Sequence, residues 1–228
     1  MAARSINARD ALIEAGIDVF GQRGYEGASN RELADAAGVN QALIAYHFDG
    51  KEGLYLAVFE SMAERIGGQF HLLAGEMEAA IEALEYARAD PEDTCLRYIE
   101  KLMERHVQIF FQPEMESYSK LILREQLEPT KAFKLLYDGL MGRIINLLTL
   151  LIAKAIGKQK PTDEDKLSAL MLLGQVLVFR SARATVTHHM DWYEGINEEQ
   201  AAQILARLRV FIHGMISALR TEFKGPAG

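Results

Sequence analysis

The chain has 228 residues, a size that fits one large domain or a small domain joined to a larger one. Apolar residues make up 49% and charged residues 25%, so the chain can bury a sizeable core beneath an ordinary charged surface. The formal net charge of −7 excludes a protein that coats nucleic acid or anionic membranes through overall positive charge. A single cysteine, Cys95, excludes an intramolecular disulfide and favours a reducing compartment.

No segment has the composition of a signal peptide or of a comfortable membrane span. The most apolar stretch, Leu140 to Ile156, is interrupted by Arg143, Asn146 and Lys154. We therefore expect a cytoplasmic protein with no membrane partner.

Residue patterns along the chain predict an all-α fold of about nine helices, because apolar residues recur at helical spacing and no run alternates like a strand. The first helix is predicted from Ile6 to Arg23, with Gly24 where it ends. The second begins at Ser29, which forms a capping box with Glu32, and it stops at Gly38.

Two more helices follow in close succession. Asn40 is expected to cap the third helix, which ends near Phe48. Asp49 is expected to cap a fourth helix from Lys51 to about Leu73, whereas the acidic stretch from Leu72 to Asp90 fits either helix or loop. The remaining helices are predicted over Glu92–Phe111, Glu114–Gln126, Pro129–Ile156, Asp163–His188 and Glu198–Phe223.

The second and third helices together predict a helix-turn-helix. Gly38 allows a sharp turn between them, and Val39 beside it is placed to lock the two helices together. Ile44 and Phe48, four residues apart, are expected to face the core with Leu33.

The outward side chains of the third helix suit the major groove of DNA. Gln41 can bond the N6 and N7 edge of adenine, and the small Ala42 and Ala45 can pack against thymine methyl groups. Tyr46, His47 and Lys51 are placed to hold phosphates, as are Ser29, Asn30 and Arg31 at the start of the second helix, with its exposed N–H groups. A plain helical bundle without DNA contacts is the alternative interpretation. The predicted DNA contacts are Ser29, Asn30, Arg31, Asn40, Gln41, Ala42, Ala45, Tyr46, His47 and Lys51.

Many of these residues form one continuous pattern. It runs through Ala15, Phe20, Gly24-Tyr25, Ser29, Leu33-Ala34, Ala37-Gly38-Val39, Tyr46-His47-Phe48, Lys51 and Leu54. This pattern resembles the DNA-binding domain of the TetR family of bacterial transcriptional regulators. Ala45 and Asn30 depart from the family pattern, where a tyrosine and a threonine are common, and these departures concern base preference rather than fold.

Two later runs, Ser119–Thr130 and Gly174–Arg180, resemble the C-terminal domain of CecR-type TetR regulators. The resemblance implies a helix-turn-helix domain over residues 1–50 and a helical ligand-sensing and dimerisation domain over residues 51–228. It also implies a homodimer that binds a palindromic double-stranded operator, acts as a repressor and is released by a small-molecule effector. No cofactor is implied.

Candidate ligand-binding residues lie in the later helices. His106 is interpreted first as a core histidine and second as part of a pocket. Arg124 and Glu125 interrupt an apolar stretch, and because buried charges need partners they belong either to a structural network, which we favour, or to a ligand pocket. The candidate set is His106, Phe110, Arg124, Phe179 and Arg183.

The last two long helices carry small residues at close spacing, among them Gly174 and Gly214. Such residues fit packing within the chain or against a second copy. The family resemblance favours the second copy, in a symmetric four-helix interface.

Other chemistry finds little support in the sequence. His188, His189 and Asp191 invite a metal site, but adjacent histidines on a helix point in different directions and no matching ligands follow. The sequence shows neither a nucleophile paired with a base nor a phosphate-binding glycine loop, so an enzyme is only a weak alternative. The main rival is therefore a helical ligand carrier or adaptor that does not bind DNA.

The charge of the N-terminal part qualifies the DNA-binding prediction. Residues 1–55 hold five Lys or Arg against eight Asp or Glu. We expect few phosphates to be neutralised, and hence a shallow dependence of DNA affinity on salt.

Overall fold

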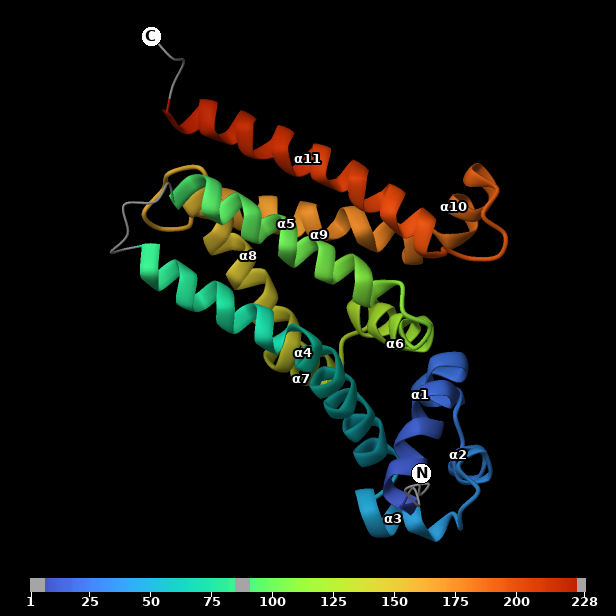
Figure 1. Cartoon of the computed structure of the whole chain (residues 1–228). Coiled ribbons are helices and arrows are strands. Elements are labelled where there is room, and N and C mark those ends of the chain that lie inside the picture. Colours follow the sequence, from blue (N-terminus) through green and yellow to red (C-terminus); the bar gives the residue numbers. More distant parts are fainter. Residues whose placement is uncertain (1–6, 85–90, 225–228) are drawn as a thin grey trace, which may run out of the picture. The chain divides into compact units, whose positions relative to one another are not determined.

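The computed structural model describes residues 7–84 and 91–224, and every regular element in these ranges is helical. These ranges contain eleven α-helices and one π-helical turn. Figure 1 labels the α-helices along the chain. The all-α prediction is confirmed. The chain divides into two compact units, Met1–Gly67 with Pro113–Met141 and Gly68–Gln112 with Gly142–Gly228. The predicted domain limit at residue 50 stays a prediction.

The first unit begins with three short helices, α1 (Ala8–Gly27), α2 (Asn30–Ala37) and α3 (Ala42–Phe48). The helical backbone of α1 is interrupted at Gly24, whose φ of 74° is in the left-handed region. Ile6, the predicted first helical residue, lies outside the described residues. The unit also contains the beginning of α4 (Lys51–Leu84), then α6 (Met115–Leu127), α7 (Lys131–Leu136) and the π-helical turn η1 (Tyr137–Met141).

The start and end of α2 follow the prediction closely. The Ser29 hydroxyl accepts a hydrogen bond from the Glu32 N–H at 3.1 Å, and the Glu32 carboxylate accepts one from the Ser29 N–H at 3.0 Å. Gly38 ends the helix with a φ of 66°. The Asn40 side chain accepts a hydrogen bond from the Ala42 N–H at 2.8 Å, so Asn40 does cap the start of α3.

The prediction that Asp49 caps α4 is wrong. Asp49 has a φ of 57° and ends α3, and its N–H donates to the Ala45 carbonyl at 3.0 Å. Gly50 stands before α4, and its carbonyl accepts a hydrogen bond from the Leu54 N–H at 3.1 Å. The junction between α3 and α4 is so tight that Asp49 takes a left-handed conformation, not the extended one that a capping residue needs.

The core of the first unit forms where α1, α2, α3 and α4 meet. Phe20, Leu33, Ile44 and Phe48 are all buried, as the helical spacing predicted for the last three. A Cβ at Gly16 would lie 2.7 Å from a Val58 methyl group, so a larger residue there would force a shift at the α1–α4 contact.

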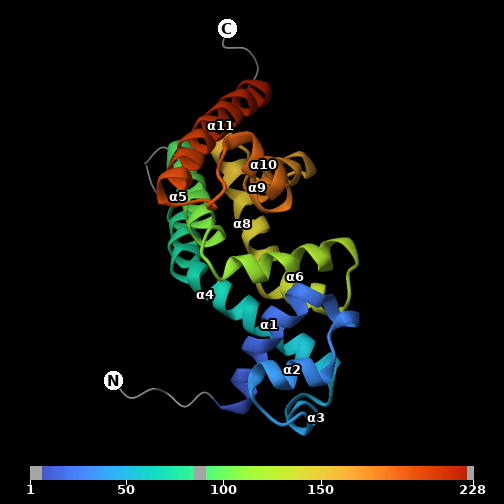
Figure 2. The ribbon, with the colours of Figure 1, turned by 90° about the vertical axis from the view of Figure 1, so that its right-hand side faces the viewer.

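Helix α6 lies against α1, as Figure 2 shows. The Ser117 hydroxyl donates to the Asp18 carboxylate at 2.8 Å. Further along α6, the side chain of Glu125 is only 2% exposed. Its carboxylate accepts hydrogen bonds from the Tyr55 hydroxyl at 2.8 Å and from the Thr130 N–H at 2.8 Å. For Glu125 the structure therefore shows the structural network.

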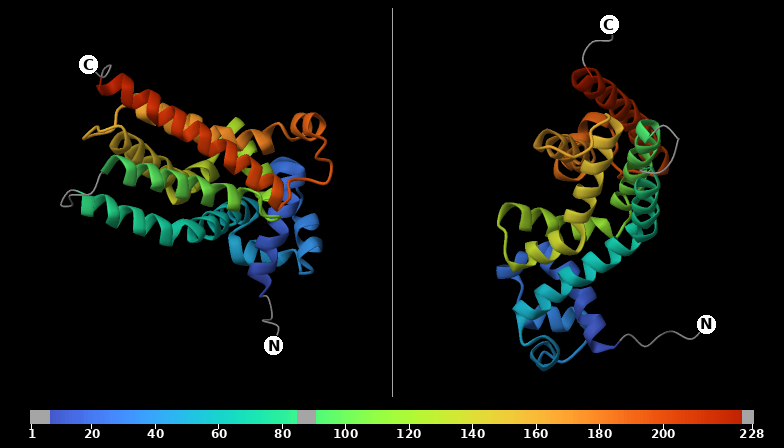
Figure 3. Two further views of the ribbon diagram at one scale, coloured as in Figure 1. Left: turned by 45° about the horizontal axis from the view of Figure 1, so that its top comes forward. Right: turned by 90° about the vertical axis from the view of Figure 1, so that its left-hand side faces the viewer.

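The second unit contains the end of α4, α5 (Pro91–Phe110), α8 (Gly142–Ala155), α9 (Asp163–Ser181), α10 (Arg183–Met190) and α11 (Glu198–Lys224). Helix α8 packs against α5 and α9, and α11 runs along α5 (Figure 3). The buried core includes Ile99, Leu102, Met103, Leu148, Leu151, Leu172 and Ile212.

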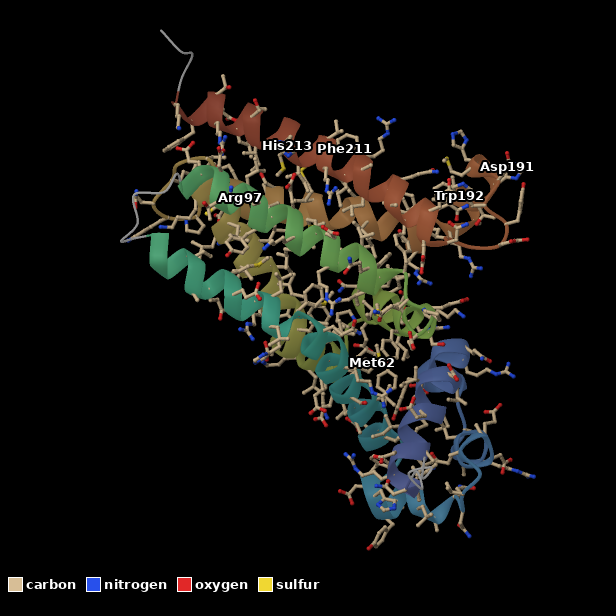
Figure 4. All side chains as sticks on the ribbon, viewed as in Figure 1. Met62, Arg97, Asp191, Trp192, Phe211 and His213 are labelled. Carbon is tan, nitrogen blue, oxygen red and sulfur yellow. The ribbon has the colours of Figure 1, made fainter. Side chains whose placement is uncertain are left out.

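Charged pairs join α5 to α11. The Arg209 guanidinium lies 3.1 Å from the Glu104 carboxylate, and His213 Nε2 lies 2.6 Å from Glu100 Oε1. Figure 4 labels His213 on α11, two residues from Phe211. Because these pairs lie at the surface, each contributes little stability, and the apolar core between the helices matters more.

Helix α1 extends to Gly27, beyond the predicted end at Arg23, and three later stretches also differ from the prediction. Helix α4 continues past Leu73 to Leu84, so the described part of the undecided stretch is helical, and residues 85–90 lie outside the described ones. The predicted helix Pro129–Ile156 is divided into α7, η1 and α8. The predicted helix Asp163–His188 is broken at Ala182, and α9 and α10 meet at an angle of 77°.

Within the residues that the structure describes, length and composition alone would allow two stretches to cross a membrane, Lys131–Ala155 and Glu198–Lys224, and the bent pair α9–α10 would be a third. The sequence interpretation considered only part of the first. In the fold, the α8 part of that stretch packs against α5 and α9.

Candidate nucleic-acid interface

The outward face of α3 carries the predicted base-reading residues. Gln41, Ala42 and Ala45 are exposed, and Tyr46 is 79% exposed. An aromatic ring this exposed contributes little to the core, so the fold of the unit does not require it. The His47 ring is partly exposed and contacts the Tyr46 ring, with 4.9 Å between centroids. The structure thus gathers the predicted α3 residues on one surface.

The N-terminus of α2 lies beside the second group of predicted contacts. Ser29 and Arg31 are exposed, and Arg31 forms a 3.6 Å surface ion pair with Asp35. Asn30 is partly buried, and its Oδ1 accepts no hydrogen bond from any described residue. A pair as exposed as that of Arg31 is weak, so the guanidinium can exchange its carboxylate partner for a phosphate.

The acidic residues near this surface are mostly engaged elsewhere. Hydrogen bonds from the Ser29 N–H and hydroxyl lower the pKa of Glu32, which is occupied in the capping box. Asp35 pairs with Arg31, and Asp49 is exposed at the end of α3. The exposed face of α3 itself carries no carboxylate.

Lys51 forms hydrogen bonds within the first unit that the sequence did not reveal. Its ammonium group donates to the Tyr25 carbonyl at 2.8 Å and to the Ala28 carbonyl at 3.0 Å. The same group lies 4.4 Å from the centre of the Tyr25 ring, a cation–π contact. The lysine spacing was visible in the sequence, but its carbonyl partners lie 23 and 26 residues away and could not be read from it.

The candidate ligand-binding residues divide between the two units. His106 and Phe110 are neighbours on α5, with 5.6 Å between ring centroids, and Phe111 links Phe110 to Phe179 on α9. Arg124 belongs to the first unit, where its guanidinium lies against Gly24. Arg183 is exposed on α10.

Burial lowers the pKa of His106 to about 4, so its imidazole is neutral at physiological pH. A neutral ring among aromatic side chains suits an uncharged part of a ligand and offers one donor and one acceptor.

A groove that the sequence did not indicate lies between the end of α4 and α5, with a volume of about 360 Å³. Its walls combine leucine side chains from α4 with charged side chains from α5. They are formed by Gly68, Gln69, Leu72, Leu73, Glu76, Lys101, Glu104, Arg105 and Gln108.

The histidine pair at the end of α10 is exposed. His188 and His189 precede Asp191, which ends the helix with a φ of 57° and is labelled in Figure 4. Within residues 7–84 and 91–224, no three His, Cys, Asp or Glu side chains group as a metal site would require.

Known protein families match both parts of the chain. The model of bacterial regulatory proteins of the tetR family matches residues 12–58, and that of the C-terminal domain of the HTH-type transcriptional dual regulator CecR matches residues 92–219. The chain is 33% identical over 193 residues to the transcriptional dual regulator CecR of Shigella flexneri, covering 84% of each chain. These relatives are transcriptional regulators and not enzymes.

Solved structures show the same fold at low sequence identity. AmtR of Mycobacterium smegmatis is 17% identical, with a TM-score of 0.61 over 99% of this chain and 98% of its own. FadR of Bacillus subtilis, solved in complex with stearoyl-CoA, is also 17% identical, with a TM-score of 0.58 over 89% of this chain and 96% of its own. The chain belongs to the TetR family of bacterial transcriptional regulators, as a DNA-binding regulator with a CecR-type C-terminal domain.

Proposed function

We propose that this regulator is a cytoplasmic repressor that binds a palindromic operator as a homodimer and leaves it when a small apolar or amphipathic effector binds. The observation that carries the proposal is the exposed, carboxylate-free face of α3, where Gln41, Ala42, Ala45 and Tyr46 point outward together. A helix with such a face fits the major groove.

On the operator, each α3 would enter one half-site, and the two half-sites would lie about 34 Å apart on one side of the DNA. Gln41 would read an adenine edge, while Ala42 and Ala45 would contact thymine methyl groups. Tyr46 and His47 would hold phosphates beside the groove, together with the N-terminus of α2 at Ser29, Asn30 and Arg31. Asn40 lies at the edge of this surface as the cap of α3.

A mobility-shift assay with variants tests this assignment. Tyr46→Ala should weaken binding to operator and to unrelated DNA by about fivefold, the loss expected for one phosphate hydrogen bond. Gln41→Ala should instead reduce discrimination between operator and single-base variants, because it removes a base contact. Leu127→Ala, an exposed leucine on α6, serves as the control that changes neither.

Tyr46→Ala that binds the operator as well as the wild type would contradict the proposed surface. If the wild-type protein shows no salt-dependent binding to promoter DNA, the result would support the rival function, a ligand carrier or adaptor with the same fold.

Dimerisation is supported by the second unit. Helices α9 and α11 expose large apolar side chains, including Leu170, Met171, Val210 and Phe211. A Cβ at Gly174 or Gly214 would meet no atom within 4 Å, so packing within the protomer does not require a small residue there. Other residues of these two helices face the core of the protomer instead, since Ala169, Leu208 and Ile212 are buried.

The effector would bind in the second unit, where ring contacts link His106 to Phe110 and, through Phe111, to Phe179, and where Arg183 follows four residues later in the sequence. Only a molecule with different affinities for the DNA-bound and free states can shift the balance between them. Native mass spectrometry of freshly purified protein would identify a bound molecule. Adding that molecule to the operator complex should then release the DNA.

Repression is tested by transcription from the operator-bearing promoter in the presence and absence of the protein. The relative from Shigella flexneri is described as a dual regulator, so the assay must detect activation as well as repression. Increased transcription in the presence of the protein would contradict the repressor proposal.

A further inference from the structure

The carbonyl groups at the C-terminal end of α1 are bound by a cationic side chain from a distant part of the chain. The last turn of α1 contains no basic side chain. Carbonyl groups at the end of a helix lack partners within the helix and attract cations. Lys51, at the start of α4, meets this need by donating to the carbonyls of Tyr25 and Ala28 at 2.8 and 3.0 Å.

The two carbonyls belong to the turn that leads into α2. Ala28 is buried and directly precedes Ser29, whose side chain caps α2. The Tyr25 ring is held in place by Tyr55, with 5.1 Å between centroids, and it faces the Lys51 ammonium at 4.4 Å. Lys51 therefore fixes the segment that determines where the N-terminus of α2 begins.

We propose that Lys51 is a positioning residue for DNA binding. It holds the α1–α2 turn so that the N-terminus of α2 meets a phosphate, and it does not neutralise a phosphate itself. This role replaces the phosphate contact predicted from the sequence, and it rests on the proposed binding of DNA by the α2–α3 surface. Two of the three N–H donors of the Lys51 ammonium are taken by these carbonyls, and the Tyr25 ring lies against the same group.

The two roles differ in how DNA affinity depends on salt. A lysine that neutralises a phosphate releases a counterion, so its removal lowers the slope of log K against log salt by about 0.9. A lysine that only positions the turn releases none. Its removal weakens binding equally at every salt concentration, because the turn must then be ordered when DNA binds.

The experiment measures operator affinity across a salt series for the wild type, Lys51→Met and Arg31→Met. Methionine keeps the apolar stem of lysine and removes the charge. Lys51→Met should bind about tenfold more weakly at every salt concentration, a loss comparable to ordering one backbone residue, with an unchanged slope. Arg31→Met, the matched control for an exposed phosphate contact, should lower the slope by about 0.9.

A second measurement needs no DNA. Hydrogen exchange of the free protein should be faster in Lys51→Met at the amides of Glu32 and Leu33, which bond to Ser29, and unchanged at Val39, at the other end of α2. Lys51→Arg, which keeps the cation and its donors, should restore most of the protection and of the affinity. Should Lys51→Met not fold, Lys51→Gln replaces it in both measurements.

Two results would overturn the proposal. One is a slope that falls by about 0.9 in Lys51→Met, which would assign a phosphate to this lysine. The other is unchanged exchange at Glu32 and Leu33, which would show that Lys51 does not hold the turn. If the wild type does not bind DNA at all, the proposed function fails, while the exchange experiment still tests Lys51.

Discussion

His106 is a residue whose surroundings make a prediction about pH. Burial lowers the pKa of its imidazole to about 4, whereas an unfolded chain gives histidine a pKa of about 6.5. Above pH 6.5 neither state binds the proton, and the residue adds no pH dependence. Between pH 6.5 and 4 only the unfolded state binds it, so acid favours unfolding.

We predict that the free energy of unfolding decreases through this window by at most about 1.4 kcal/mol per pH unit because of His106. Urea unfolding at pH 7.5, 6.0, 5.0 and 4.5 measures the effect. His106→Gln should lose this part of the pH dependence, whereas His189→Gln, at an exposed position, should retain it. Parallel pH curves for the wild type and His106→Gln would contradict the prediction.

Single residues also show which features the sequence could predict. The capping box of Ser29 and Glu32 depends on residues three positions apart, and the exposed face of α3 depends on the helical period. Both features could therefore be predicted from the local sequence. The partners of Lys51 and the neighbours of His106 are set by tertiary packing. No local pattern indicates that Lys51 meets the carbonyl of Ala28.

At the scale of elements, the helical type of the described elements followed from period and caps, but the breaks that divide two of the predicted helices did not. Helix α9 ends at Ser181 without a proline or glycine beside it, so the pattern gave no reason to stop there. The π-helical turn η1 contains Gly139, where a Cβ would lie 3.2 Å from the Ala63 Cβ on α4. That crowding comes from another element and is invisible in the local sequence.

The α6–α7 connection provides a prediction about stability. The buried Glu125 carboxylate accepts hydrogen bonds from the Tyr55 hydroxyl, from Thr130 and from the Phe133 N–H at the start of α7. Glu125→Ala would leave the buried Tyr55 hydroxyl and the partly buried N–H groups of Thr130 and Phe133 without this partner. It should therefore lower the free energy of unfolding by about 3 kcal/mol.

Urea unfolding at pH 7 measures this change. Gln126→Ala, at the next and exposed position, is the control and should change stability by less than about 0.5 kcal/mol. An equally small change in Glu125→Ala would show that water or rearrangement satisfies the donors of Tyr55 and Thr130.

At the scale of the whole molecule, the exposed apolar surface of the second unit must be reconciled with a protein in water. Phe211 on α11 is 61% exposed, and Val210 and Met171 are more exposed still. Several large apolar side chains this exposed on two helices indicate an interaction surface. In a family whose operators are expected to be palindromic, a second copy of the chain is the occupant that matches the symmetry of the DNA.

Two substitutions test the proposed dimer. Phe211→Glu places a charge on the surface, and Gly214→Leu adds a side chain where the protomer has open space, so both should fold normally. Each should weaken dimerisation by about 30-fold or more, as loss of a central contact does. Sedimentation would show monomers, and operator binding would fall because one protomer holds only one half-site.

Leu127→Glu, at a leucine 82% exposed in the first unit, is the control and should remain dimeric. Phe211→Glu and Gly214→Leu that both remain dimeric would place the interface elsewhere on the chain.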